Sequence, residues 1–288
     1  MLGDIPRALW YEATARDPLP RQPEHELVMN DAGTVSDYTS CGTEGGALFG
    51  PYLYNAAQVS ARVRTGDLVL DLGCGSGQLL NLIARWNPAT RFRGIDLAPN
   101  MLAEGRAAAA AAGLSNVDFV EGDFSTLDGI ADGSVDAVIS SMALHHLPDR
   151  GALTRCFDAI GRVLRPGGAL YLMDFGRLRS DRSLEIFVAK VAVSETKALT
   201  QDYRASLHAA FTPGDFQTEI ARLSRRNVAF YRTPLAPLAM VAATPARNMV
   251  PGGNALFHQA VRRLSRTRRA ELAQLRMFLG LGGLRFPR

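Results

Sequence analysis

The sequence predicts an α/β protein with a seven-stranded, mostly parallel sheet that is covered by helices on both faces. Short apolar runs alternate with stretches of helical composition from residue 67 onward. Five of these runs are apolar nearly throughout, as expected for parallel strands that are buried on both faces. Two further apolar runs follow a mainly helical stretch at 180–224, which brings the expected strand count to seven.

The pattern assigns each element in order. The first five strands are expected at Leu68–Asp71, Arg91–Asp96, Val117–Val120, Val135–Ser140 and Ala169–Asp174. The helices between them are expected at Gln78–Trp86, Pro99–Ala112 and Leu153–Leu164. The second of these starts at a proline and stops before Gly113, both favoured at those helix ends. The last two strands are expected at Val228–Tyr231 and Leu238–Ala243, and one helix at 258–279 follows them.

The chain length favours one large domain with additions to it. Residues 1–63 are expected to form an N-terminal helical lid, with a glycine-rich loop at 31–50. Residues 64–245 form the predicted α/β domain, and the insertion 176–212 between strands five and six is expected to wall the substrate site. Residues 246–288 are expected to form a basic C-terminal helical extension.

The charge is unevenly distributed along the chain. Residues 262–288 hold eight arginines and one glutamate, whereas the whole chain has a net charge of only +4. The body is therefore mildly acidic, and we interpret the tail as a solvated helix face, with an anion or nucleic-acid contact as the alternative. We do not expect nucleic acid to be the main partner.

Other features of the sequence predict a cytoplasmic protein. No apolar run reaches 18 residues, and residues 1–6 lack the basic and apolar parts of a signal peptide. The three cysteines are odd in number, and no pair has metal-ligand spacing. A reducing compartment, no membrane span and no metal site are therefore expected.

A glycine-rich turn carries the clearest chemical signal. Val69-Leu70-Asp71-Leu72-Gly73-Cys74-Gly75-Ser76-Gly77-Gln78 runs from a buried strand through three glycines into a helix. Glycines permit positive φ angles and a close approach of ligand to backbone. In a parallel sheet, ligands bind at the carboxyl ends of the strands. Taken alone, such a turn suits several nucleotide-like cofactors, NAD and FAD among them.

The ends of the next two strands narrow the choice. The second strand ends at Asp96, whose two carboxylate oxygens can accept both ribose hydroxyls of an adenosine. NAD-binding proteins share this acid. The third strand ends in Glu121-Gly122-Asp123-Phe124. An acid there is absent from the NAD pattern, but it can accept from the adenine amine while the aromatic ring covers the base.

Five motifs in this order resemble those of the class I methyltransferases that depend on S-adenosylmethionine (SAM), in particular the small-molecule branch with the ubiquinone/menaquinone C-methyltransferases. The resemblance covers roughly residues 65–175. The matching motifs are Val69–Gly77, Gly94–Asp96, Glu121–Phe124, Ala137–Asp149 and Leu164–Gly168. It implies a Rossmann-like fold, SAM as the cofactor and S-adenosylhomocysteine (SAH) as the product.

The resemblance also implies contacts around the glycine turn. The backbone of Gly73, Gly75 and Gly77 would lie against the methionine part of SAM, and Asp71 would orient its amino group. Cys74 belongs to this cofactor turn by position and is interpreted as a small filler. That a glycine merely shapes the turn remains the alternative.

Further implied contacts come from the second and third strands. Asp96 would hold the ribose, and Leu97 and Met101 would lie against the adenine side. Asp123 would accept from the adenine amine, and Phe124 would cover the ring. A helix-capping role for the first acid and a plain core role for the phenylalanine stay open.

The fourth strand bears on the acceptor. Ser140 would offer its carbonyl to the SAM ammonium. The stretch Ser140–Ala143 lacks the Asn/Asp-Pro-Pro-aromatic quartet of methyltransferases that act on adenine, cytosine or glutamine amines. His145 and His146 are candidate general bases for a hydroxyl, phenol, thiol or acidic carbon. Packing of one histidine and helix capping by the other are the alternatives.

The predicted function is methyl transfer to the O, N or C atom of a small molecule. The lid is expected to close over the cleft, with Tyr38 as a third catalytic candidate. The alternatives are an RNA or protein methyltransferase, an enzyme that uses SAM otherwise, such as for cyclisation, and a SAM-binding regulator. Three scattered cysteines fit arsenite methylation poorly. A homodimer stays open.

Overall fold

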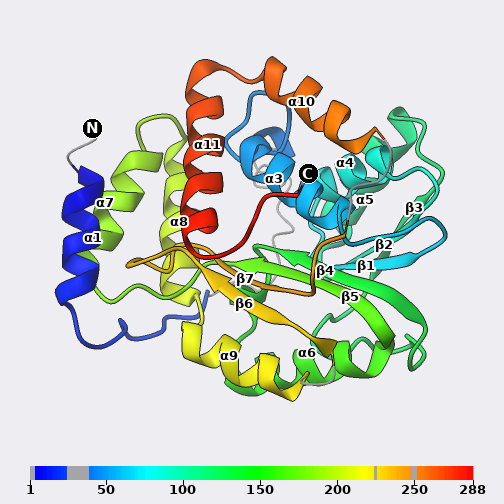
Figure 1. Cartoon of the computed structure of the whole chain (residues 1–288), viewed down its shortest axis with the longest axis horizontal. Coiled ribbons are helices and arrows are strands. Elements are labelled where there is room, and N and C mark those ends of the chain that lie inside the picture. The colour runs from blue at the N-terminus through cyan, green and yellow to red at the C-terminus, as the bar shows by residue number, and fades with distance from the viewer. Residues whose placement is uncertain (1–3, 25–38, 224–225, 248–251, 288) are drawn as a thin grey trace.

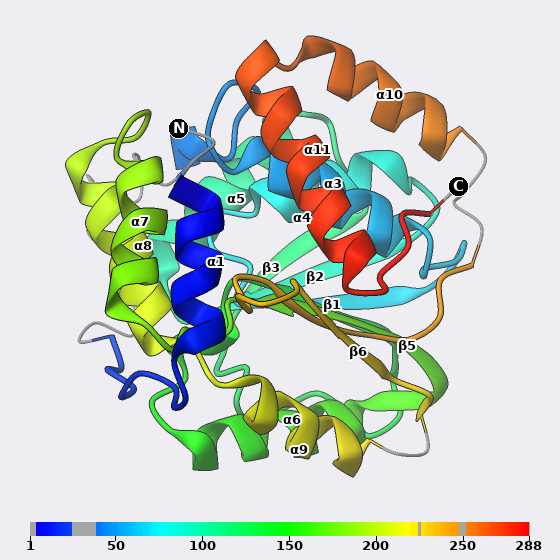
Figure 2. The ribbon, with the colours of Figure 1, turned by 60° about the vertical axis from the view of Figure 1, so that its left-hand side comes forward.

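The computed structural model describes residues 4–24, 39–223, 226–247 and 252–287. Its middle layer is a seven-stranded sheet with the order β3-β2-β1-β4-β5-β7-β6, with helices above and below it (Figures 1 and 2). The predicted fold class and strand number are therefore confirmed. The strands are β1 (Leu68–Leu72), β2 (Arg91–Asp96), β3 (Val117–Glu121), β4 (Val135–Ser141), β5 (Leu164–Asp174), β6 (Ala229–Arg232) and β7 (Met240–Ala243).

The first five strands are parallel, and β7 is antiparallel to both β5 and β6. Strand order reverses at β1, because β2 and β3 lie on one side of it and β4 and β5 on the other. In the register, Asp71 is opposite Gly94 and Asp96 is opposite Glu121. The carboxyl ends of β1, β2 and β3 therefore meet at one edge, beside the switch point where ligands bind in such sheets.

The helices follow the predicted pattern, except that the helix expected at Leu153–Leu164 begins three residues earlier, at Arg150, and that the last expected helix is divided in two. They are α1 (Asp4–Thr14), α3 (Phe49–Ser60), α4 (Gln78–Trp86), α5 (Pro99–Ala111), the 3₁₀ turn η1 (Leu144–His146), α6 (Arg150–Val163), α7 (Asp181–Val191), α8 (Lys197–Ala209), α9 (Pro213–Arg222), α10 (Gly253–Arg263) and α11 (Arg266–Leu281). The single helix expected at 258–279 is wrong. The chain leaves the helix at Leu264, and the Ser265 side chain caps a new helix by accepting from the Arg268 N–H.

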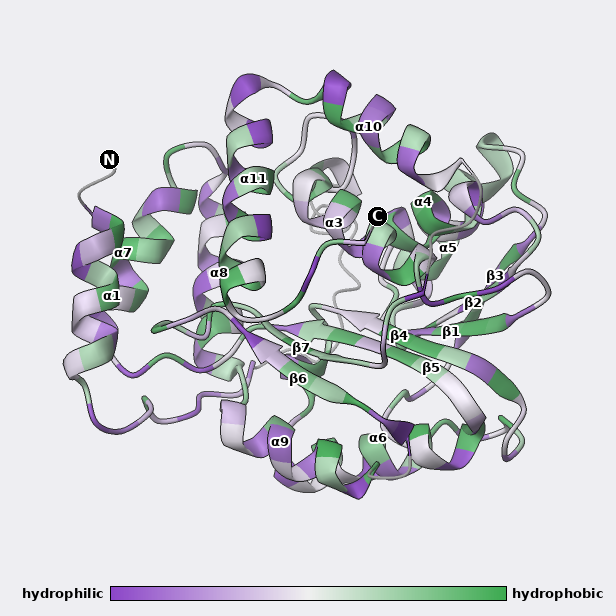
Figure 3. Ribbon diagram, viewed as in Figure 1, coloured by the Kyte–Doolittle hydropathy of each residue, from purple (hydrophilic) through white to green (hydrophobic). Residues whose placement is uncertain are grey.

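Two core layers enclose the sheet. Apolar side chains from α3, α4, α10 and α11 pack on one face, and those from α6 and α9 pack on the other (Figure 1). Figure 3 shows hydrophobic residues along the strands and polar residues on the outer sides of the helices. Nearly every residue of α3 is buried, including the polar Asn55 and Gln58, so this helix of the N-terminal segment is part of the core.

A third, smaller cluster joins α1 to α7 and α8. Ala8, Leu184 and Leu207 are among its fully or nearly fully buried members. Figure 2 shows α1, α7 and α8 side by side, next to the carboxyl ends of the parallel strands. Elements before and after the parallel strands in sequence therefore meet beside the switch point. Among the described helices, none is long and apolar enough to cross a membrane.

Candidate active site

The glycine turn after β1 has the backbone conformation that glycine alone adopts easily. Gly73, Gly75 and Gly77 have φ angles of 68°, 52° and 67°, which lie in the left-handed region. A Cβ on Gly73 would be 2.4 Å from the Cβ of Ala143, and a Cβ on Gly77 would be 2.4 Å from the Phe119 ring. The turn therefore needs glycine both for its shape and for the close approach of its neighbours.

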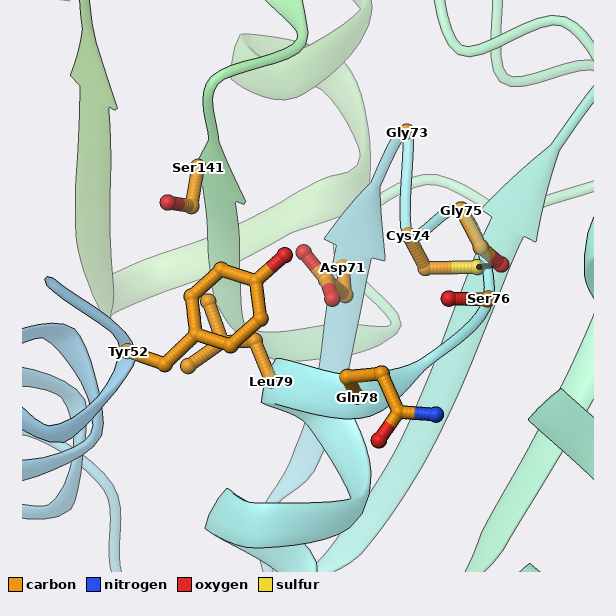
Figure 4. Close-up of a pocket in the computed structure, with 9 residues that line it drawn as sticks. All are labelled: Tyr52, Asp71, Gly73, Cys74, Gly75, Ser76, Gln78, Leu79 and Ser141. Carbon is orange, nitrogen blue, oxygen red and sulfur yellow. Dashed lines mark hydrogen bonds between the residues drawn. The ribbon is translucent and has the colours of Figure 1, made fainter. Parts of the chain in front are cut away.

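A small pocket lies directly against this turn (Figure 4). Asp71 lines it although the residue is only 3% exposed. Burial, together with the nearby charge of Asp96, raises the pKa of the Asp71 carboxyl to about 8. Tyr52 from α3 directs its hydroxyl toward Asp71, and Ser141 from β4 completes that side of the pocket (Figure 4). A positively charged ligand group would favour the ionised form of this acid.

Asp96 holds the glycine turn and the start of α5 together. Its Oδ2 atom accepts from the Gly75 N–H at 2.8 Å, and its Oδ1 atom accepts from the Ala98 N–H at 2.9 Å. Leu97 beside it is 39% exposed, and both Leu97 and Met101 line a large cavity. Apolar side chains that line a cavity next to a paired carboxylate suit a ligand with a planar apolar part and hydroxyl groups.

Of the other predicted cofactor residues, some line one of the two pockets and others do not. Phe124 lines the large cavity, and Cys74 lines the small pocket, where burial raises the pKa of its thiol. Asp123 is exposed, accepts from the Ser125 N–H at 2.7 Å and does not line either pocket. Gly77 does not line them either, and its place against Phe119 is a packing role.

Ser140 and its neighbour Ser141 have different positions. The Ser140 hydroxyl is buried and donates to the Leu72 carbonyl at 2.8 Å, so it joins β4 to β1. Ser141 lines both pockets, and its hydroxyl accepts from the Asn55 side chain at 2.8 Å. Strand β4 runs one residue further than expected. Ser141 lines the two pockets, and the expected role of the Ser140 carbonyl stays a prediction.

The large cavity measures about 460 Å³ and is mainly apolar. It begins at the glycine turn and the Leu97 side, and other segments complete its walls. Pro51 and Tyr52 come from α3, Val191 and Leu199 come from α7 and the start of α8, and α11 supplies the last wall. The α11 residues that line it are Arg268, Glu271, Gln274 and Leu275.

An ionisable cluster forms the polar end of this cavity. His145 and His146 in η1 both line the cavity. The Nδ1 atom of His145 is 2.6 Å from Asp174 Oδ1, at the end of β5, and its backbone N–H donates to Asp174 Oδ2. Glu24 places its Oε1 atom 3.8 Å from His145 Nε2 and its Oε2 atom 2.7 Å from His146 Nδ1. Acid and imidazole groups from three distant segments thus converge here.

The charges in this cluster influence one another. Burial alone would lower the pKa of His145, but the adjacent carboxylates of Asp174 and Glu24 outweigh it and raise the pKa. Burial would raise the pKa of Glu24, but the two imidazoles and the Ser206 hydroxyl lower it. Burial also raises the pKa of Asp202, which lines the cavity nearby. The cluster therefore favours a protonated imidazole or another cation between carboxylates.

Arg21 fixes the N-terminal segment beside η1. Its guanidinium donates to the carbonyls of His145 at 3.0 Å and Ala209 at 2.7 Å, and it lies 4.1 Å from the centre of the Phe211 ring. These contacts hold the segment that places Glu24 against His145 and His146. Sequence reasoning missed Glu24, because nothing in the local pattern marks it. It also missed Asp174, although the end of the fifth strand was a usable signal. Tyr38 lies outside the described residues.

A comparison with known proteins identifies the central domain. Residues 69–168 match the family described as a methyltransferase domain. Over 133 residues the chain is 35% identical to a ubiquinone biosynthesis O-methyltransferase of Xanthomonas axonopodis, covering 46% of this chain and 53% of that protein. Over 115 residues it is 36% identical to an arsenite methyltransferase of Halobacterium salinarum, covering 40% and 28%. The chain thus spans about half or less of the length of these relatives.

Solved structures share the fold. The plantazolicin methyltransferase in complex with SAH matches with a TM-score of 0.56 and 14% identity, over 91% of this chain and 92% of that chain. A SAM-dependent methyltransferase from Aquifex aeolicus matches with a TM-score of 0.52 and 14% identity, over 75% and 100%. These structures share the fold of this chain. Together with the methyltransferase match over residues 69–168, they confirm the resemblance inferred from the five motifs.

Proposed function

We propose that this protein transfers the methyl group of SAM to a small-molecule acceptor that binds in the large cavity. One observation carries the proposal. Gly73, Gly75, Tyr52 and Ser141 line both the small pocket beside Asp71 and the large apolar cavity. A cofactor held at the glycine turn would therefore present its reactive end directly to the acceptor space.

The residues at the strand ends fit the parts of SAM. Asp71 is a buried carboxylate whose charge is disfavoured by burial and by Asp96, and the amino group of the methionine part would supply the opposite charge. Each Asp96 oxygen keeps acceptor capacity beside its backbone hydrogen bond, as the ribose hydroxyls require. Leu97, Met101 and Phe124 offer apolar surface to the adenine. The role of Asp123 stays a prediction.

When bound, SAM supplies a methyl group attached to a positively charged sulfur. The acceptor's lone pair would form a bond to the methyl carbon, and the electrons of the carbon–sulfur bond would pass to sulfur, which gives SAH. The protein's part is to align the two molecules and to exclude water. Burial of the acceptor between α3, α8 and α11 would do both. One of His145 and His146 would take the proton of an acceptor hydroxyl, since both lie at the polar end.

The placement of the basic tail favours a small-molecule acceptor over RNA. Arg268 pairs with Glu195 at 2.6 Å, Arg263 pairs with Glu44 at 2.8 Å, and Arg276 lies 3.9 Å from the centre of the Phe286 ring. The side chains of these arginines make contacts within the chain, and α11 forms one wall of the cavity. We propose a cytoplasmic enzyme on the evidence of its composition, with the oligomeric state open.

An arsenic acceptor has less support. The relative from Halobacterium salinarum carries the name arsenite methyltransferase, but of the three cysteines only Cys41 lines the large cavity. Cys74 lies in the glycine turn, and Cys156 is fully buried in α6. A mainly apolar cavity with a polar end instead suits an organic acceptor whose hydroxyl or amine lies among the histidines.

The decisive experiment is product analysis. The purified protein is incubated with SAM and a panel of aromatic hydroxyl, amine and quinol compounds, and the nucleoside products are identified by mass spectrometry. Acceptor-dependent formation of SAH supports the proposal. Methylthioadenosine would indicate that SAM is used for cyclisation or a related reaction. Tight SAM binding without any product would indicate a SAM-binding regulator, and no SAM binding would overturn the cofactor assignment.

A further inference from the structure

Metal-ligating atoms meet at the polar end of the cavity. Glu24, His145 and His146 each offer one ligand atom, and these three atoms lie within 4.8 Å of one another. Two imidazoles and one carboxylate, with space for a further ligand, form the donor set of catalytic zinc sites. The sequence predicted no metal site, because its only metal criterion was cysteine spacing and Glu24 is more than a hundred residues away from the histidines.

The separations suit a small cation. Glu24 Oε1 is 3.8 Å from His145 Nε2, and Glu24 Oε2 is 2.7 Å from His146 Nδ1. Atoms bound tetrahedrally at about 2.1 Å from zinc are roughly 3.4 Å apart. The two separations involve different oxygens of Glu24, so the carboxylate would have to shift slightly away from His146 for one cation to bind between the three side chains. The Nδ1 atom of His146 is buried and makes no hydrogen bond of good geometry within the described part of the chain. A nitrogen and a carboxylate oxygen that face each other in this way favour a cation between them.

Asp174 gives His145 the orientation of a metal ligand. The 2.6 Å contact with Asp174 Oδ1 assigns the proton of His145 to Nδ1 and leaves the Nε2 lone pair on the side of Glu24. Carboxylate–histidine–metal arrangements of this kind orient the ring and make the coordinating nitrogen more basic. Asp174 is itself fixed, because it also accepts from the backbone N–H groups of His145 and Phe175.

We propose that Glu24, His145 and His146 bind one zinc-like divalent cation, and that Asp174 positions His145 for this role. Two imidazole ligands disfavour Mg²⁺ and Ca²⁺, which prefer oxygen. The remaining coordination position faces the cavity that both histidines line. An acceptor hydroxyl bound there would lose its proton to solvent more easily and become the methylated oxygen. With the cation bound, this route replaces proton transfer to one of the two histidines, because their lone pairs are then used by the metal. That use rests on the proposed methyl transfer, whereas metal binding itself does not.

The test measures metal binding directly. Full-length protein is treated with a chelator, freed of it and titrated with zinc chloride by calorimetry. We expect one zinc per chain, and at least a tenfold loss of affinity in Glu24→Gln and in His146→Gln. Asp174→Asn should weaken binding by roughly 10- to 100-fold through the orientation of His145. His258→Gln is the matched control, because this histidine is exposed on α10, and its variant should bind zinc as the parent does.

Two further measurements distinguish the outcomes. SAH affinity is measured for every variant, and unchanged values show that each variant is folded. The absorption spectrum of the cobalt-substituted protein should lack a thiolate charge-transfer band, since Cys41 also lines the cavity. The proposal is overturned if zinc does not bind, if Glu24→Gln and His146→Gln bind it as the parent does, or if cobalt is bound by thiolate. Failure of the parent to bind SAH would instead overturn the proposed function.

Discussion

The two sides of the large cavity are built in different ways. Most of the cofactor side, residues 71–124, comes from one continuous part of the chain, and its glycines and acids follow consecutive strands. Tyr52 and Ser141 join it from α3 and β4. The acceptor side is assembled from Glu24, α3, η1, Asp174, α7, α8 and α11. The first side depends mainly on backbone conformation and strand ends. The second depends on which distant side chains meet, and substitutions should therefore affect the two sides differently.

The largest expected effect concerns the pH dependence that Asp71 gives to the cofactor side. In the unfolded chain this acid ionises near its ordinary pKa of 3.8, but in the folded protein its pKa is about 8. Between these values the folded state holds a proton that the unfolded state lacks. The contribution of Asp71 to stability is therefore greatest below pH 4, falls as the pH rises toward 8 and levels off above it.

Asp71→Asn removes this dependence. Each unit by which the pKa of this acid differs between the folded and unfolded states changes the free energy of unfolding by about 1.4 kcal/mol. The variant should therefore be more stable than the parent by several kcal/mol at pH 9 and by little at pH 4. Denaturant unfolding at pH 4, 6, 8 and 9 without SAM measures the difference. Parallel stability curves for parent and variant would contradict the assignment.

The second largest effect is expected when a methyl group is added to Gly73. Gly73→Ala forces a Cβ to 2.4 Å from Ala143 at a φ of 68°, and we expect a loss of about 2 kcal/mol or more together with much weaker SAH binding. Gly129→Ala is the matched control, because its φ is 77° but no atom lies within 4 Å of the added Cβ. It should lose only about 1 kcal/mol. Equal losses in thermal unfolding would show that the close approach to Ala143 does not matter.

Asp96→Ala tests the ribose contact. The variant loses the carboxylate that accepts from Gly75 and Ala98 and that would hold the ribose hydroxyls. SAH affinity should fall by about 1–3 kcal/mol, or roughly 10- to 100-fold. Asp118→Ala is a suitable control, since this acid pairs with Arg93 on the surface away from the cavity. If both variants bind SAH as the parent does, Asp96 has only a structural role.

The smallest effect is expected on the acceptor side at α11. Arg268 is largely buried and pairs with Glu195 across the cavity wall. Arg268→Met keeps most of the apolar stem and removes the charge, so we expect a several-fold rise in the KM of the acceptor with SAH affinity unchanged. Steady-state kinetics with an acceptor found by product analysis measures it. A loss of SAH affinity alone would show that the two sides are not independent.

The comparison also explains which features were predictable. Helix α4 was predicted with its observed bounds, because its apolar periodicity and the preceding Gly77 are local signals. Strand β2 was also predicted with its observed bounds. The break at Leu264–Ser265 was missed, because the apolar pattern continues across it and only the Ser265 cap marks the new start. Ser141 was missed for a similar reason, since strand ends are the least certain part of a sequence-based assignment.

By itself, the sequence determined the α/β class, the succession of strands and helices along the chain and the cofactor motifs, because each depends on neighbouring residues. Gly73, Asp71 and Asp96 could be recognised without knowing anything beyond their own strands and turns. The tertiary structure alone decided that Glu24 meets His145 and His146, that Asp174 orients His145, and that the basic tail walls the cavity. Those contacts join residues far apart in the chain. The pairing of β4 with β5 brings Asp174 to His145, and the packing of helices and of the N-terminal segment around the sheet brings the other residues together.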